Sequence, residues 1–241
     1  MSVNLIIIGA GGSSRDIAEA IASSDPEKKN WNLLGFLDDD AAKQGTIVDG
    51  IPVLGVLDSV STYPDAKVLI GVAGYQESST RKNLVQRLGL PDERYTTFVH
   101  PSAFLSPSAK IGLGVAVLQN VVISSSATIG SHVLLSPGTA IGHDAVVHDY
   151  VVLAAEALVC GNVAIHECAF IGARSVLSPA TVVGAGVLVG IGAVVVQDVE
   201  PGATVFGNPA RALNTAGRQH RWRPAPKRQP CLPGDQIHTA G

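Results

Sequence analysis

The sequence predicts two parts: an N-terminal α/β domain with a parallel sheet, followed by a parallel β-helix. Two observations lead to this prediction. Short apolar runs alternate with helical patterns from residue 3 to about 95, which is typical of α/β domains. From Val99 onward an aliphatic residue then returns at every sixth position. Composition agrees, because 46% of the 241 residues are hydrophobic and only 5% are aromatic, as aliphatic layers require.

The first part, residues 1–98, is expected to be a small α/β domain. Val3 to Ile8 is a short apolar run before glycine, as in a buried parallel strand. Residues 14–22 carry apolar side chains at helical spacing and predict a helix. Further strands are expected over 31–37 and 67–72, and a second helix over 80–88. Strands alternating with helices predict a parallel sheet.

The second part, residues 99–212, repeats with a period of six. The first position of 17 consecutive hexads is always Ile, Leu or Val, without insertion, from Val99 to Val195. The fifth position is always valine or a small residue. Neither a strand nor a helix has this period, whereas a three-sided coil with one hexad per side does. Glycine follows the aliphatic residue at 112, 130, 142, 172, 184 and 190. We expect those glycines to supply the unusual dihedral angles of tight corners.

The pattern stops near Thr215, and residues 213–241 are expected to form an extended tail. The net charge of −3 argues against nucleic-acid or anionic-membrane partners. No stretch approaches the about 18 apolar residues of a membrane-spanning helix, and the first residues do not resemble a signal peptide. The three cysteines form no metal-binding pattern, which favours a reduced, cytoplasmic setting.

A glycine-rich segment, Gly9-Ala10-Gly11-Gly12-Ser13-Ser14-Arg15, follows the first strand and opens the first helix. Glycines allow close approach of a ligand, and free N–H groups at a helix start attract phosphate. The third glycine of the dinucleotide fingerprint is Ser14, so the domain is Rossmann-like rather than a full match. Asp38-Asp39-Asp40 after the second strand provides acceptors for a ribose or base. A nucleotide or nucleotide sugar is favoured over NAD, and a plain glycine turn beside a solvated acidic loop remains the alternative.

A histidine and an aspartate are adjacent within the repeat, at His143 and Asp144. One full coil later, three hexads further along the chain, Gly161 and Asn162 stack on them. A carboxylate beside an imidazole suits a general base, and a stacked glycine leaves room for a ligand and an oxyanion-binding N–H. A merely solvated surface histidine is the alternative.

His148 and His166 are also separated by three hexads and should stack at a corner. Such a pair is a possible metal site, but an exposed corner pair is the simpler interpretation. His143 and His148 have the spacing of the zinc-binding histidine pair in the hexapeptide-repeat carbonic anhydrases, whose third zinc ligand lies about 36 residues before the first; counted from His143, that position here is Pro107. We therefore expect no metal.

These motifs together resemble the bacterial sugar O- and N-acetyltransferases, including those that act on sialic acid and on nucleotide-linked amino sugars. The similarity extends over residues 3 to about 212. It is carried by "IIIGAGGSSRDIAEAI", "LLGFLDDD", "IGHDAVVHDYV", "VCGNVAIHECAFIGARSVLSP" and "VFGNPAR". The resemblance implies a left-handed β-helix and homotrimers with active sites between subunits.

The resemblance also implies residue roles. His143 would be the general base and Asp144 its orienting partner. Acetyl-CoA would contact Gly161, Ala173 and Arg211. In the N-terminal domain, Gly11, Gly12 and Ser13 would hold the diphosphate, Asp38 and Asp39 the nucleoside, and Gly74 would line the same site. Two positions depart from some relatives: Val152 replaces a histidine that contacts the acyl donor, and the glycine loop has serine in place of a histidine.

The function that follows is acetyl-CoA-dependent acetylation of the amino group of a nucleotide-linked amino sugar, in glycan or polysaccharide biosynthesis. O-acetylation of a sugar such as sialic acid needs the same base and stays open. A non-enzymatic, trimeric nucleotide-sugar-binding protein is the third possibility.

Overall fold

The computed structural model describes residues 2–25, 27, 30–73 and 79–213. Its N-terminal part is a five-stranded sheet with the order β3-β4-β2-β1-β5, in which the β3–β4 pair is antiparallel and the other pairs are parallel. The strands are β1 (Val3–Ile8), β2 (Trp31–Leu37), β3 (Ile47–Val48), β4 (Ile51–Gly55) and β5 (Lys67–Ile70). The first two were predicted with these bounds.

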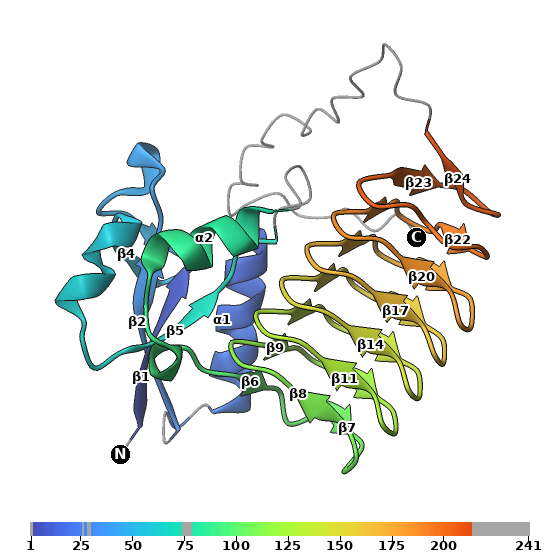
Figure 1. The fold of residues 1–241 in the computed structure, drawn as a ribbon. Helices are drawn as coiled ribbons and strands as arrows, with labels where there is room; N and C mark the ends of the chain where they lie inside the picture. The colour runs from blue at the N-terminus through green and yellow to red at the C-terminus, as the bar shows by residue number, and fades with distance from the viewer. Residues whose placement is uncertain (1, 26, 28–29, 74–78, 214–241) are drawn as a thin grey trace, which may run out of the picture.

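Helices cover both sides of this sheet. α1 (Gly12–Ser24) packs on one side, where Ile17 and Ile21 join Leu5 and Ile7 in the core. α2 (Thr80–Leu88), with the bounds that the sequence predicted, packs on the other side. Three short 3₁₀ turns complete the domain: η1 (Ala41–Lys43), η2 (Leu57–Thr62) and η3 (Asp92–Arg94). The expected α/β domain is confirmed (Figure 1).

The second part is a parallel β-helix with three faces. The docking face contains β6 (Phe98–Val99), β9 (Ala116–Val117), β12 (Leu134–Leu135), β15 (Val152–Leu153), β18 (Phe170–Ile171), β21 (Leu188–Val189), β23 (Thr204–Phe206) and β24 (Arg211–Ala212). The six-strand face contains β7 (Phe104–Leu105), β10 (Val122–Ile123), β13 (Ala140–Ile141), β16 (Leu158–Val159), β19 (Val176–Leu177) and β22 (Val194–Val195). The five-strand face contains β8 (Lys110–Ile111), β11 (Thr128–Ile129), β14 (Val146–Val147), β17 (Ala164–Ile165) and β20 (Val182–Val183).

Strands of successive coils pair at an offset of three hexads, as Val122 with Ala140 and Ala140 with Leu158. The first and fifth positions of the hexads fill the interior, as the period of six predicts. Three buried polar residues at the fifth position, Thr139, Ser175 and Thr181, direct their hydroxyls to the carbonyl three residues earlier. The last coil is shorter than the others, because Leu188 pairs with Thr204 and not with Phe206.

The expected role of the glycines after the aliphatic residue was wrong. None of them has a positive φ. The left-handed conformation falls two residues later, at the fourth position, which non-glycine residues such as Asn120, Asp144 and Asn162 occupy. The glycines are needed for space instead. A Cβ on Gly142, for example, would lie 2.5 Å from the backbone of Cys160 in the next coil.

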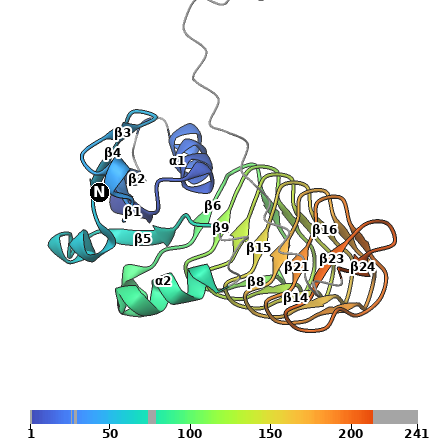
Figure 2. The same cartoon turned by 90° about the horizontal axis from the view of Figure 1, so that it is seen from above.

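The N-terminal domain packs against the docking face of its own chain (Figures 1 and 2). The outward residues Ala116, Leu134 and Val152 lie in one core with Ile17 and Ile21 of α1. Among the described residues, no element covers the outward side chains of the other two faces in this way, and Val122, Val146 and Leu158 are exposed. In this part of the chain the domain thus closes one face and leaves the other two open.

Candidate active site

His143 and Asp144 lie at the corner between β13 and β14, where the six-strand face meets the five-strand face. We call it the His143 corner. Asp144 has a φ of 56°, and its Oδ2 lies 2.8 Å from His143 Nδ1. A carboxylate can only accept this hydrogen bond, so the contact favours the tautomer of the neutral imidazole that has its proton on Nδ1 and a free lone pair on Nε2. Both side chains are exposed, so Nε2 is accessible to a substrate.

Gly161 lies directly against the imidazole, one coil beyond His143. A Cβ at this position would lie 2.5 Å from Nε2, so only glycine leaves the ring where it is. The backbone N–H of Asn162 donates to the carbonyl of His143 at 2.9 Å and fixes the two coils together. No residue in the described part of the chain accepts a hydrogen bond from the Gly161 N–H. The sequence-predicted trio of His143, Asp144 and Gly161 is therefore in contact.

A second candidate region, the glycine-loop cleft, lies in the N-terminal domain beyond the carboxyl ends of β1 and β5. The strand order reverses between these two strands, which is where open α/β sheets bind ligands. The cleft encloses about 240 Å³. It is lined by Gly9, Gly11, Gly12, Ser13, Ser14, Asp38, Lys43, Gly71, Val72 and Ala73.

Two glycines of this cleft are not required by the fold itself. A Cβ on Gly11 or Gly12 would meet nothing within 4 Å, and neither residue has a positive φ. Gly11 is the N-cap of α1, and no side chain caps the helix. The free N–H groups and the positive end of the helix dipole thus open onto empty space, an arrangement that suits a phosphate.

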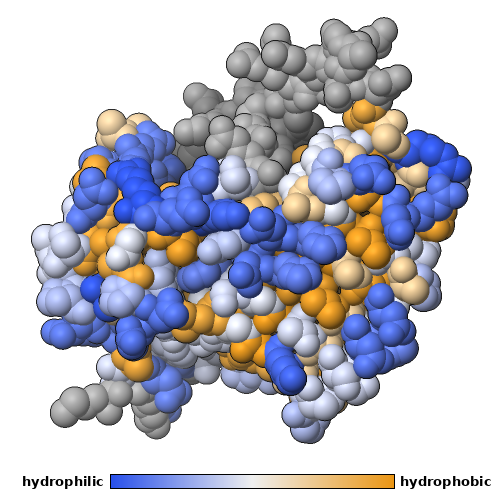
Figure 3. Space-filling model, in the orientation of Figure 1, coloured by the Kyte–Doolittle hydropathy of each residue, from blue (hydrophilic) through white to orange (hydrophobic). Residues whose placement is uncertain are grey.

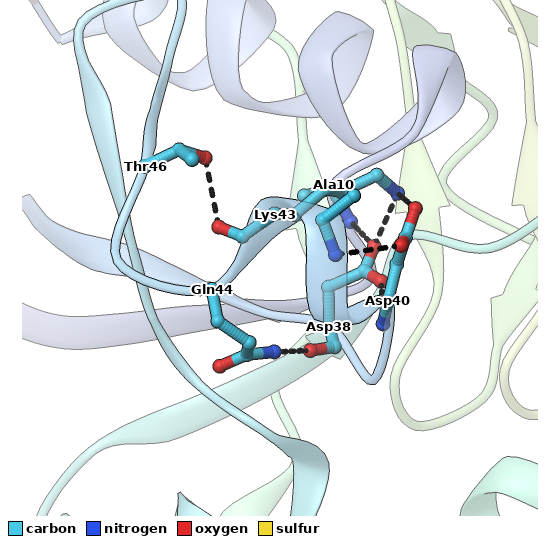
Figure 4. Close-up of polar contacts among 7 residues, drawn as sticks. Ala10, Asp38, Asp40, Lys43, Gln44 and Thr46 are labelled. Carbon is cyan, nitrogen blue, oxygen red and sulfur yellow. Dashed lines mark hydrogen bonds and ion pairs between the residues drawn. The ribbon is translucent and has the colours of Figure 1, made fainter.

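Asp38 braces the glycine loop from inside the cleft (Figure 4). Its carboxylate accepts from the N–H of Ala10 at 2.7 Å, from that of Asp40 at 2.9 Å and from Lys43 Nζ at 2.8 Å. Burial alone would raise the pKa of Asp38, but the hydrogen bonds from Lys43, Asp40 and Ala10 outweigh it and hold that pKa below its ordinary value. Asp38 is therefore an anion that shapes the loop.

Asp39, also expected to bind the nucleoside, is not among the cleft-lining residues. Its carboxylate pairs with Arg87 of α2 and accepts from the N–H of Leu57 at 3.1 Å. Burial opposes this charge, yet the Arg87 hydrogen bond keeps the pKa of Asp39 below its ordinary value. Gly74, the last of the expected binding residues, lies outside the described residues.

The cleft also contains two residues that the sequence reasoning did not assign to binding. Lys43 lines the cleft and directs its ammonium group to Asp38, and its only sequence signal was a lysine shortly after the acidic run. Ser14 replaces the third glycine of the fingerprint. Its hydroxyl is fully buried without a hydrogen-bond partner in the described part of the chain, and it fills the space beside Gly71.

The residues expected to contact acetyl-CoA are spread over the β-helix. Gly161 lies at the His143 corner, whereas Ala173 lies between β18 and β19, at the corner of the docking and six-strand faces. Arg211 is exposed on β24, and no described residue forms an ion pair with it. Val152 is buried against the N-terminal domain and does not approach His143. Within one chain, these residues do not form one compact site.

His148 and His166 stack as predicted, with ring centroids 5.0 Å apart and planes 5° from parallel. Among the described residues no group of three or more His, Cys, Asp or Glu side chains is placed to hold a metal ion. A search of the same residues finds no helix with the length and hydrophobicity to cross a membrane.

Fold and site together define a hexapeptide-repeat acyltransferase with an N-terminal α/β domain. Residues 4–88 match the family described as the PglD N-terminal domain. UDP-N-acetylbacillosamine N-acetyltransferase of Bacillus subtilis is 34% identical over 120 residues, which are 48% of this chain and 51% of the relative. The chain thus spans about half the length of this relative.

Solved structures extend the match to the whole fold. The acetyltransferase domain of PglB from Neisseria gonorrhoeae, in complex with acetyl coenzyme A, is 30% identical with a TM-score of 0.76, over 88% of this chain and 100% of that one. A mutant perosamine N-acetyltransferase from Caulobacter crescentus, in complex with CoA and GDP-perosamine, is 25% identical with a TM-score of 0.76, over 87% and 96%. The chain belongs to the bacterial hexapeptide-repeat acetyltransferases represented by this PglB domain, and its β-helix is left-handed.

Proposed function

We propose that this protein transfers the acetyl group of acetyl-CoA to the amino group of a nucleotide-linked amino sugar. The single observation that carries the proposal is the contact of His143, Asp144 and Gly161 at the His143 corner. The glycine-loop cleft supports the nucleotide-linked acceptor. Relatives named as N-acetyltransferases of amino sugars favour the amine over a hydroxyl as acceptor.

His143 would act as the general base. Its Nε2 takes a proton from the sugar amine while the nitrogen attacks the thioester carbonyl of acetyl-CoA. The tetrahedral oxyanion would accept a hydrogen bond from the Gly161 N–H. The C–S bond then breaks, the new amide remains on the sugar, and the imidazolium returns its proton to the CoA thiolate. Asp144 holds the Nδ1–H tautomer and stabilises the transient positive charge.

The glycine-loop cleft would hold the nucleotide part of the acceptor. The diphosphate would lie against Gly11, Gly12 and Ser13 at the start of α1, with Lys43 as a further positive charge. Asp38 would support nucleotide binding indirectly, by fixing the glycine loop through its hydrogen bond to Ala10. Asp39 would do so by fixing the segment after β2 through its contacts with Leu57 and Arg87. Gly74 stays in this proposal on the strength of the family resemblance.

The acetyl-CoA groove would be shared between copies of this chain. The His143 corner lies between the two faces that the chain's own N-terminal domain leaves uncovered. A neighbouring copy would bring its Ala173 corner against the Gly161 of this one, and Arg211 would meet a phosphate of the donor. A bound acetyl-CoA would therefore contact residues that are apart on a single chain.

The assembly proposed is a homotrimer. The six-strand face presents an apolar outward column: Phe104, Val122, Ala140, Leu158, Val176 and Val194. Val146 and Val182 add exposed apolar surface on the five-strand face, and Figure 3 shows apolar residues on the surface of the β-helix. Two different uncovered faces on each chain favour a heterologous contact, and the family resemblance implies that this contact closes into a ring of three.

The test is acetylation of UDP-, dTDP- and GDP-linked amino sugars, followed by release of free CoA. Wild-type protein should acetylate at least one of them, and His143→Ala should lose about 100-fold or more in kcat. Equal activity of His143→Ala would refute the assigned base. Thermal shifts separate the non-enzymatic alternative, because an enzyme is stabilised by CoA as well as by nucleotide.

A further inference from the structure

Arg81 is the most deeply buried charged residue of the described chain, at 1% exposure. It lies in the first turn of α2, where the N-terminal domain meets the β-helix. No carboxylate in the described part of the chain pairs with it, and its Nη2 has no hydrogen-bond partner there. Burial lowers its pKa to about 9. Burial of a guanidinium is costly, and the three hydrogen bonds that Arg81 makes with described residues indicate what it does in the structure.

The three hydrogen bonds of Arg81 join two separate structures. Nη1 donates to the carbonyls of Ile70 and Val72, at 3.0 Å and 2.7 Å. Nε donates to the carbonyl of His132, at 2.9 Å, on the corner between the five-strand and docking faces. One planar group therefore holds the end of β5 and a coil of the β-helix at a fixed separation.

The segment held by Nη1 is a wall of the glycine-loop cleft. Gly71 and Val72 both line the cleft. A Cβ on Gly9 would lie 2.6 Å from Val72 Cγ2, so the glycine loop and this wall are packed without spare room. A shift of the wall would therefore move the loop that is proposed to hold the diphosphate.

The carbonyl held by Nε is itself rigidly placed. The His132 ring is buried, stacks on Tyr150 with centroids 5.5 Å apart, and meets the edge of Tyr95 at 4.6 Å. Burial and the nearby Arg81 charge lower the pKa of His132 to about 4, so the ring is neutral. The acceptor of the Arg81 bond thus belongs to a packed part of the β-helix.

We propose that Arg81 is a positioning residue that sets the glycine-loop cleft relative to the β-helix, and so presents the nucleotide-linked acceptor to the general base. This inference rests on the proposed function for its kinetic consequence. The expected effect on nucleotide affinity does not depend on acetyl transfer, because the cleft wall must keep its position for any nucleotide to bind.

The experiment compares four full-length proteins: wild type, Arg81→Met, Arg81→Lys and Lys82→Met. Methionine removes the charge and keeps an apolar side chain of similar length, whereas lysine keeps the charge but cannot bridge both structures. Lys82→Met is the matched control, because the neighbouring Lys82 also joins α2 to the β-helix, through an exposed ion pair with Glu167 at 2.9 Å. Exposed pairs of this kind contribute little.

The measurements are kcat and KM for the sugar nucleotide, the Kd values of UDP, dTDP and GDP, the Kd of acetyl-CoA, and the thermal midpoint. Arg81→Met should lower kcat/KM for the sugar nucleotide by about 10- to 100-fold, the loss expected of a misplaced substrate. It should weaken nucleotide binding and leave the Kd of acetyl-CoA unchanged. Arg81→Lys should be intermediate, and Lys82→Met should match wild type.

Unchanged nucleotide affinity and unchanged kcat/KM in Arg81→Met would overturn the inference. If the methionine variant does not fold, the same two unchanged values in Arg81→Lys would overturn it. An equal loss of acetyl-CoA and nucleotide affinity would also overturn it, because that indicates general structural damage. If wild type binds UDP, dTDP or GDP but acetylates no sugar nucleotide, the proposed function fails, while the nucleotide Kd of the variants still tests Arg81. Wild type that binds none of UDP, dTDP and GDP overturns both.

Discussion

Replacing Gly161 by alanine would place a methyl group where the imidazole of His143 now lies. The added Cβ would fall 2.5 Å from Nε2 and 2.6 Å from Cε1, whereas ordinary van der Waals contact begins at 3.4 Å. The ring must therefore retreat by about 0.9 Å. Because the clash involves the atom that is proposed to take the proton, the substitution tests the general base without removing it.

The expected loss is catalytic rather than structural. Gly161 does not have a left-handed φ, so alanine introduces no backbone strain. The side chain that must move is exposed, so it can shift away from the methyl group without displacing packed neighbours, although its hydrogen bond to Asp144 is then strained. A displacement of about 1 Å at a reacting group costs about 100-fold in rate, which corresponds to about 2.7 kcal/mol of activation free energy. Gly161→Ala should thus lower kcat by this amount, with an unchanged thermal midpoint and an unchanged nucleotide Kd.

The assay is CoA release under saturating acetyl-CoA, combined with thermal unfolding of each variant. Gly112→Ala is the contrasting variant: its Cβ would lie 2.6 Å from the backbone of Gly130, which cannot rotate away, so the thermal midpoint should fall. In a His143→Ala background, Gly161→Ala should have no further effect on rate. Wild-type kcat in Gly161→Ala, or an equal loss in both backgrounds, would refute the reasoning.

Three further predictions concern the cleft, the open faces and the domain junction. Gly12→Ala should raise the free energy of unfolding by up to about 1 kcal/mol, because alanine favours the helix. The same substitution should weaken the binding of UDP or GDP measured by calorimetry, and an unchanged affinity would exclude Gly12 as a phosphate contact. Leu158→Lys should convert trimers to monomers in sedimentation and abolish acetyl transfer, and a monomeric wild type would contradict the proposed assembly. Folding lowers the pKa of His132 from 6.5 to about 4, so as the pH falls the unfolded chain takes up a proton on this residue before the folded chain does. The free energy of unfolding should therefore decrease between about pH 6.5 and about pH 4, by up to about 3 kcal/mol. His132→Asn should remove that pH-dependent part in denaturant titrations; an unaltered pH slope would contradict it.

The sequence was sufficient to predict the β-helix because its pattern constrains the fold so strongly. A period of six cannot arise from a strand or an ordinary helix, and the offset of three hexads between paired strands follows from it directly. The prediction that glycines such as Gly142 supply unusual dihedral angles was wrong. Composition alone does not distinguish a residue that needs an unusual φ from one that needs space, and only the contact with the next coil decides.

The two sites differ in how much the sequence could predict. His143, Asp144 and Gly161 are related by the coil period, so their contact was predictable from residue numbers. Asp39 and Arg81 are related to their partners by the packing of α2, which no local pattern encodes. Asp39 pairs with Arg87, 48 residues away, and Arg81 bonds to His132, 51 residues away. Partners at such separations become known only once the tertiary structure is.

The position of the N-terminal domain supplies a further argument for assembly. The hexad pattern gives apolar outward residues on all three faces, so the sequence alone does not identify the covered one. The structure places the domain on the docking face, which leaves the His143 corner between the two open faces. A nucleotide-linked sugar held in the glycine-loop cleft therefore starts on the other side of the β-helix from the base of its own chain. The base of a neighbouring chain, brought close by contact between open faces, is the partner that this arrangement favours.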